Sequence, residues 1–111
     1  MKHNMKLKNE PFIMMESGIK TIEMRLYDEK RKNIQIGDEI EFSNVTTGKT
    51  LRVKVLNLHL FKNFDELYNN FDKEKLGYHK DDLAKPTDMS QFYSDEEIKQ
   101  YGVVGIEIEL I

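Results

Sequence analysis

Apolar and polar residues alternate along several short segments of the chain, which is the pattern of strands buried on one face. The final segment, VVGIEIELI, is the clearest case, and we expect Val104, Ile106, Ile108 and Leu110 to face inward. The same alternation in KTIEMR predicts a strand over residues 20–25. Further strands are predicted at residues 5–8, 39–42 and 51–61, whereas residues 1–4 are expected to have no role in the fold.

The long apolar run LRVKVLNLHLF changes the parity of its pattern part-way along. Its first apolar residues fall on odd positions up to Val55, and the later ones fall on even positions from Leu56 onward. Such a change within one run predicts a β-bulge, which bends a strand around a barrel. Asn57 and His59 would then share the face opposite the later leucines.

Helix signals separate these strands. Pro11 is suited to the first turn of a helix that Gly18 ends, and FDELYNNF predicts a short amphipathic helix. In SDEEIKQYG, Ser94 and Glu97 have the spacing of a capping box, and Gly102 supplies the stop. Strands and helices in this order predict an α+β fold: one domain, residues 1–111, with a small, curved, mostly antiparallel sheet of about five or six strands.

Composition narrows the function. The chain of 111 residues has no cysteine, which excludes disulfides, thiolate zinc sites and cysteine nucleophiles. Its three histidines are far apart and form no metal-binding motif, so we expect no metal and no cofactor. No segment is long and apolar enough to span a membrane, and we expect a cytoplasmic protein, taken as a monomer.

The charge is unevenly distributed. The net charge is −3, but residues 1–62 carry nine Lys and three Arg against eight acids, whereas residues 63–111 carry five Lys against twelve acids. This asymmetry permits a basic face on the first half of the chain. Avid, non-specific nucleic-acid binding requires a more basic domain and is not favoured.

The segment GIKTIEMR concentrates polar chemistry on one predicted strand, in Lys20, Thr21, Glu23 and Arg25. The residues alone favour a solvent-facing ion pair over a site, because exposed charges are the norm on half-buried strands. His59 is more typical of a partly buried, hydrogen-bonded histidine than of a catalyst, and packing of the last helix is the more typical role for Tyr93.

Taken in order, the motifs resemble the ASCH (ASC homology) domain family, whose fold is similar to PUA-like β-barrels. The resemblance extends from about Met5 to Leu110 and rests on an EPF helix, GxKTIExR, DEKRxxIxxGDxIxF, FDELY and YSxEEIxxYGVxGIxI. It implies RNA or nucleotide binding in a cleft between the barrel and its helices, beside the GxKT segment. The ligand-binding set that we expect on this analogy is Lys20, Thr21, Glu23, Arg25, His59 and Tyr93.

Some small bacterial members of the family are amidohydrolases that remove the acetyl group from 4-acetylcytidine, and others have been linked with RNA cleavage. Lys20 matches the lysine of the amidohydrolase pattern, but the position of its threonine nucleophile is Glu23 here. A second family glutamate is not placed by this sequence. Glu23 would then act as a general base on water beside a protonated Lys20.

Three functions therefore stay open. The first is a module that binds a nucleotide or short single-stranded RNA. The second is a hydrolase that acts on a modified pyrimidine nucleoside or on RNA, with Lys20 and Glu23 as catalytic residues. The third is a protein-interaction domain that keeps the fold without the chemistry.

Overall fold

The computed structural model describes residues 1–111, which form five strands, four α-helices and one 3-10 helix. In chain order the elements are β1 (Lys2–Leu7), α1 (Asn9–Glu16), β2 (Ile22–Leu26), α2 (Glu29–Lys32), β3 (Glu39–Asn44), β4 (Thr50–Phe61), α3 (Phe64–Asn70), η1 (Pro86–Gln91), α4 (Asp95–Tyr101) and β5 (Val103–Leu110).

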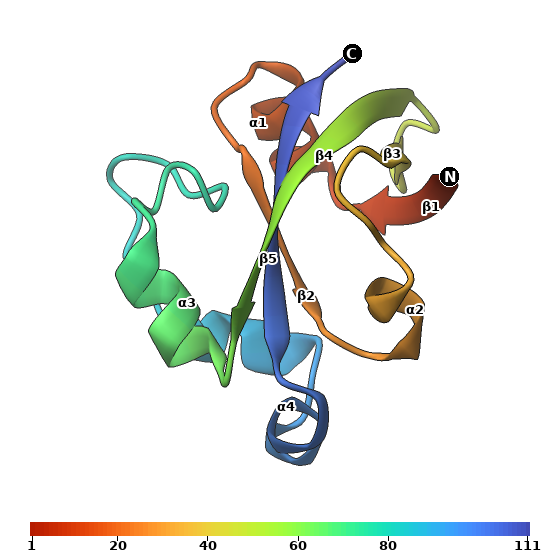
Figure 1. The fold of residues 1–111 in the computed structure, drawn as a ribbon. Coiled ribbons are helices and arrows are strands. Elements are labelled where there is room, and N and C mark those ends of the chain that lie inside the picture. The colour runs from red at the N-terminus through yellow and green to blue at the C-terminus, as the bar shows by residue number, and fades with distance from the viewer.

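The five strands form one curled sheet in the order β1-β3-β4-β5-β2 (Figure 1). β1 and β3 pair in parallel, and the other three pairings are antiparallel, which confirms the predicted α+β fold with a mostly antiparallel sheet. The register between β4 and β5 shifts between Val55 and Asn57, so the predicted bulge lies at Leu56. The bulge bends β4, which pairs with β3 over residues 50–54 and with β5 over residues 53–61.

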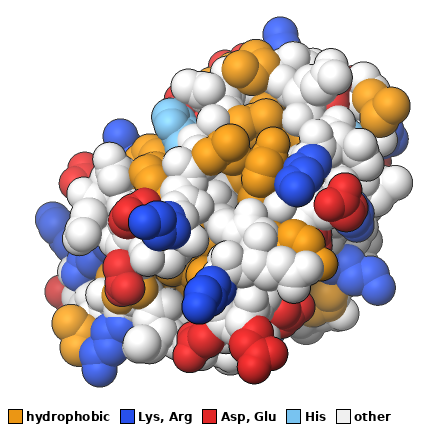
Figure 2. Space-filling view, turned by 60° about the horizontal axis from the view of Figure 1, so that its bottom comes forward, with side chains coloured by type: hydrophobic (Ala, Val, Ile, Leu, Met, Phe, Trp, Pro, Cys, Tyr) orange, Lys and Arg blue, Asp and Glu red, His pale blue; other side chains and the backbone are white.

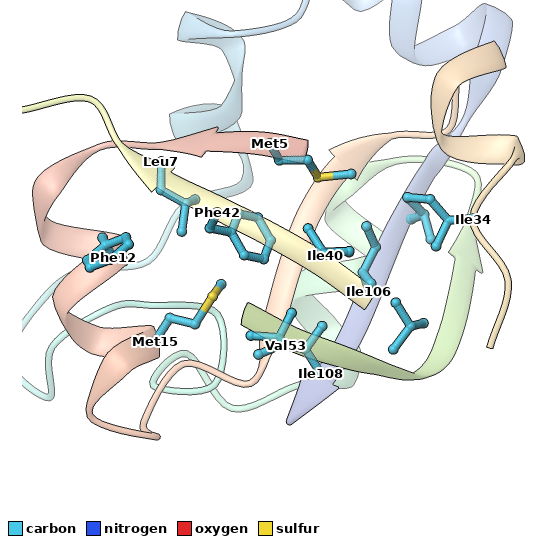
Figure 3. Close-up of a cluster of buried hydrophobic side chains, with 12 residues drawn as sticks. Met5, Leu7, Phe12, Met15, Ile34, Ile40, Phe42, Val53, Ile106 and Ile108 are labelled. Carbon is cyan, nitrogen blue, oxygen red and sulfur yellow. The ribbon is translucent and has the colours of Figure 1, made fainter. Parts of the chain in front are cut away.

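The larger of two apolar cores fills the concave side of the curled sheet, between β1, β3, β4, β5 and α1 (Figure 3). Phe42, Ile40 and Val53 are fully buried at its centre, and Phe12 and Met15 of α1 cover one end. These strand residues fall on alternate positions, as half-buried strands require. The sequence pattern therefore identifies this core correctly.

The smaller core lies beneath the helices of the second half of the chain. It contains Ile22 and Met24 of β2, Phe64 and Leu67 of α3, and Met89 of η1. In Figure 1 the segment between α3 and η1 extends away from the sheet as an irregular loop. This core therefore joins β2 to a segment that contains little regular structure.

The last helix begins and ends as predicted. The Ser94 hydroxyl accepts a hydrogen bond from the Glu97 amide, and the Glu97 carboxylate accepts one from the Ser94 amide. Gly102 follows the helix with a φ of 72°. A Cβ at Gly102 would lie 3.0 Å from the carbonyl oxygen of Phe61, so both conformation and space require glycine there.

Two local predictions are wrong. The first strand begins at Lys2, and the His3 side chain contacts Asp38 at 2.9 Å, so the first residues do have a role in the fold. Alternation over residues 5–8 misses this because the parallel pairing of β1 with β3 starts before the apolar positions. Leu110 is 43% exposed rather than inward, since it lies at the end of β5 beyond the core.

Candidate functional site: a cleft beside β2

A cleft of about 410 Å³ lies between the edge strands β1 and β2 and the segment that leads from Leu76 into η1. Such a volume falls within the range of ordinary small-ligand sites. Its wall is mixed: cations and acids face apolar and aromatic side chains. The lining residues are Lys6, Leu7, Lys8, Pro11, Lys20, Glu23, Met24, Arg25, Leu76, Gly77, Tyr78, Asp88, Met89, Gln91, Phe92 and Tyr93.

Lys20 precedes β2 and is only 3% exposed. Its ammonium group donates to the carbonyl oxygens of Ile22 at 2.8 Å and Leu76 at 2.9 Å. It also lies 3.2 Å from Glu23 Oε1. These three acceptors match the three N–H groups of an ammonium ion. Through these hydrogen bonds, Lys20 connects the segment around Leu76 to the start of β2.

Glu23 is only 4% exposed. The predicted solvent-facing ion pair of Glu23 and Arg25 is therefore wrong. The face that carries Glu23 is covered, because the amides of Thr21 and Ile22 both donate to the Lys75 carbonyl oxygen at 3.0 Å and hold that segment over the strand. Both carboxylate oxygens are occupied: Oε1 by Lys20 and Oε2 by Arg25.

Arg25 connects the two edge strands of the sheet. Its Nε donates to Glu23 Oε2 at 2.7 Å, and its Nη2 donates across the gap to the Lys6 carbonyl oxygen of β1, also at 2.7 Å. Tyr93 also hydrogen-bonds to this guanidinium, and the side chain is 16% exposed. A guanidinium has five N–H donors, so the contacts with Glu23, Lys6 and Tyr93 leave at least one of them unused. A guanidinium with unused donors on a cleft wall is suited to an anion.

The three charges do not cancel, because two cations surround one carboxylate. Burial lowers the pKa of Lys20, and the attraction of Glu23 only partly opposes this lowering. Burial would raise the pKa of Glu23, but Arg25 and Lys20 outweigh burial and lower it.

Burial acts against the charge of Arg25 too, but Glu23 and then Tyr93 raise its pKa. Together, Lys20, Glu23 and Arg25 carry one net positive charge. A negative ligand beside Arg25 would offset this charge.

Tyr93 lies on the same cleft, whereas two other predicted residues do not. The Tyr93 ring stacks on Phe64 with centroids 6.1 Å apart, so it packs the smaller core and lines the cleft at once. Thr21 uses its backbone to hold the Lys75 segment, and its side chain does not line the cleft. His59 contacts Glu107 Oε1 at 2.8 Å on the β4–β5 pair, away from the cleft.

The sequence patterns miss several residues of the cleft. Lys6 and Lys8 belong to or follow the first strand, and Tyr78, Asp88 and Phe92 come from the irregular segment after α3. No periodicity marks a residue in such a segment, because its position is set by tertiary hydrogen bonds. The one available signal is GY in KLGYHK: Gly77 has a φ of 104°, and a Cβ there would lie 3.0 Å from Lys20 Cδ.

Comparisons with known proteins place this geometry in a family. The sequence model of the ASCH domain matches residues 5–111. The chain belongs to the ASCH domain family. The crystal structure of the hypothetical protein PH0355 is similar to this ASCH chain with a TM-score of 0.84 and 38% identity, over 100% of both chains. The solution NMR structure of protein PF0455 from Pyrococcus furiosus is similar with a TM-score of 0.78 and 35% identity, over 100% of this chain and 98% of that one. A search of curated proteins finds no match.

The residues of this ASCH cleft are poorly suited to general-base chemistry. Glu23 is a poor general base, because a lowered pKa and two bound cations reduce its tendency to take a proton.

No group of three or more His, Asp or Glu side chains comes together as a metal site. None of the helices is long and apolar enough to cross a membrane.

Proposed function

We propose that this ASCH chain, as one domain, binds a nucleotide or a short single-stranded RNA segment in the cleft beside β2. Arg25 is the primary contact for a phosphate group in this proposal. The observation that carries it is an unused N–H donor of Arg25 on the cleft wall, next to a buried group of charges with one positive charge in excess. Charge-assisted hydrogen bonds from a guanidinium to a phosphate are among the strongest that proteins make.

The remaining wall of the cleft supports a nucleotide rather than a free phosphate ion. Phe92 is 49% exposed on the rim, and Tyr93 lies beside it with ring centroids 6.4 Å apart. Aromatic faces of this kind stack on bases in proteins that bind single strands. Lys6 and Lys8 lie on the same rim, and Lys8 Nζ is 5.0 Å from the centre of the Phe92 ring.

The charges outside the cleft support a local contact rather than a broad polyanion surface. On the face in Figure 2, Lys and Arg side chains alternate with Asp and Glu side chains around a hydrophobic patch. This face therefore has no broad surface of a single charge sign. A ligand with one or a few phosphates suits such a distribution better than a long duplex.

Binding of AMP, CMP and a short single-stranded RNA, measured by calorimetry, tests this function. Adenosine and cytidine, which lack the phosphate, serve as matched ligands. We expect Arg25→Gln to weaken nucleotide binding about 10- to 100-fold, the size of a lost hydrogen bond to a charged group. Arg52→Gln is the matched control, because Arg52 is 53% exposed, pairs with Glu39 and does not line the cleft.

The comparison of variants decides the outcome. Because Arg25 also connects β1 and β2, each variant is first checked for native NMR spectra. The proposal would be overturned if folded Arg25→Gln bound nucleotides with the same affinity as Arg52→Gln. So would nucleosides that bind as tightly as their phosphates.

A hydrolase is the second candidate, and the observation that favours it is the lowered pKa of Lys20. A lysine that loses its proton more readily is closer to a nucleophile or base at neutral pH. The test is loss of the acetyl group from 4-acetylcytidine, with Lys20→Ala and Glu23→Gln as variants. Turnover that both variants abolish supports the hydrolase, and no turnover by the parent chain rejects it for this substrate.

A further inference from the structure

The part of the cleft lining that η1 supplies contains a carboxylate with one unused oxygen, that of Asp88. Asp88 Oδ2 accepts a hydrogen bond from the Tyr78 hydroxyl at 2.7 Å and a longer one from the Lys85 amide at 3.3 Å. Asp88 Oδ1 makes no hydrogen bond within the chain. Both Asp88 and Tyr78 line the cleft. The cap of η1 therefore explains one oxygen of this carboxylate and leaves the other available to a ligand.

The direction of the hydrogen bonds around Asp88 is fixed by chemistry. An ionised carboxylate only accepts, so Tyr78 donates its proton to Asp88. The Tyr68 hydroxyl, 2.7 Å from that of Tyr78, must then donate to the Tyr78 oxygen. Burial, followed by contact with Tyr68 and Asp88, raises the pKa of Tyr78 well above its usual range, so both protons stay in place. Two donors therefore orient the Asp88 carboxylate through Oδ2, and its Oδ1 can only accept.

Glu23 has no free oxygen with which to accept a hydrogen bond from a ligand. The base-reading role expected of it from the sequence needs a free carboxylate oxygen, but Lys20 and Arg25 occupy both. Asp88 is the other acid on the cleft. The lining of the cleft therefore contains the cationic Arg25 and an accepting group at Asp88, together with apolar Met24, Leu76 and Met89.

We propose that Asp88 Oδ1 accepts a hydrogen bond from the exocyclic amino group of the bound base, so that the cleft selects nucleotides whose base carries such a group. This inference rests on the proposed nucleotide function and names its ligand more narrowly. Carboxylates accept from the amino group of cytosine in known protein–nucleic acid contacts. A site built to hydrogen-bond one group discriminates strongly against an analogue that lacks it.

The test compares CMP and AMP with the 5′-phosphates of 2-pyrimidinone riboside and purine riboside, which lack only the amino group. We expect the parent chain to prefer at least one amino-bearing nucleotide about tenfold over its analogue. Asp88→Asn should remove this preference. Tyr78 and Lys85 require an acceptor at the position of Oδ2, so the asparagine must place its NH₂ group where Oδ1 was.

That geometry yields a second expected result. An NH₂ group at this position donates, so Asp88→Asn should shift preference from CMP toward UMP, which has a carbonyl oxygen in place of the amino group. Asp81→Asn is the matched control, because Asp81 is an exposed acid of the same segment and does not line the cleft. It should keep the preference of the parent chain.

The outcomes separate this inference from the proposed function. Equal affinity of the parent chain for both amino-bearing nucleotides and their analogues overturns the role of Asp88, while binding that depends on phosphate and Arg25 would still support the function. A preference that survives in folded Asp88→Asn also overturns it. No binding of any mononucleotide or short RNA overturns both.

Discussion

Two groups of buried charges in this chain have opposite characters. Asp38, at the turn before β3, is 8% exposed and lies 2.9 Å from both the His3 side chain and the Gln35 amide. Lys20, Glu23 and Arg25 lie beside β2 with two cations for one carboxylate. The first group faces no cleft, and the second faces a cleft of about 410 Å³.

The difference teaches how to separate structural charges from candidate binding charges. The bond from His3 holds β1 to the turn before β3, and the bond from the Gln35 amide closes that turn, so stability is a sufficient reason for both. The bonds of Lys20 are equally structural, but Arg25 retains at least one unused N–H donor at the cleft. Charge imbalance together with unused donors, rather than burial alone, points to a ligand.

The largest effect on stability is expected from Lys20→Met. The change removes the ammonium group and leaves the carbonyl oxygens of Ile22 and Leu76 without a donor in a buried place. Breaking buried polar networks in this way costs about 3 kcal/mol of unfolding free energy. Urea unfolding measures it, with the exposed Lys54→Met as the control. A loss as small as that of the control would show that Lys20 does not hold the Leu76 segment.

Gly77→Ala should cost less, about 2 kcal/mol. The residue has a φ of 104°, and its Cβ would lie 3.0 Å from Lys20 Cδ, whose chain is fixed by three acceptors. Gly48→Ala has a similar φ of 77° but meets nothing within 4 Å. Urea unfolding measures the loss of unfolding free energy in each variant. The amount by which the loss in Gly77→Ala exceeds that in Gly48→Ala isolates the contact with Lys20. Equal losses would contradict this contact.

The smallest effect is expected at Asp38 and depends on pH. The contact with His3, then that with the Gln35 amide, lowers the pKa of Asp38 from 3.8 to about 2. Because the pKa is lower in the folded state, Asp38 contributes stability above pH 3.8 that is lost as pH falls through about 2. Subtracting the acid titration of Asp38→Asn from that of the parent should reveal this loss. Parallel curves between those pH values would refute it.

Most of the fold follows from local patterns. Alternation and the parity change in β4 predict the strands and the bulge, and the Ser94 cap predicts α4. The burial of Glu23 could not be predicted, because the segment that covers it is held by the amides of Thr21 and Ile22, partners distant in sequence. The positions of Asp88 and Tyr78 on the cleft could not be predicted either, because both lie in the irregular segment after α3 or in η1. Lys20, Glu23 and Arg25 could be predicted as a group because they lie within six consecutive residues.

The central claim is that Arg25 and its cleft form a binding site for an anionic nucleotide. A ¹⁵N NMR titration of the chain with AMP and CMP, observing Arg25 Nε–H and the amides of Gly77 and Tyr93, tests it most directly. The account predicts saturable shifts of all three signals, with His3 and Asp38 unchanged. Signals that stay fixed, or shifts that gather around Asp38 instead, would contradict it.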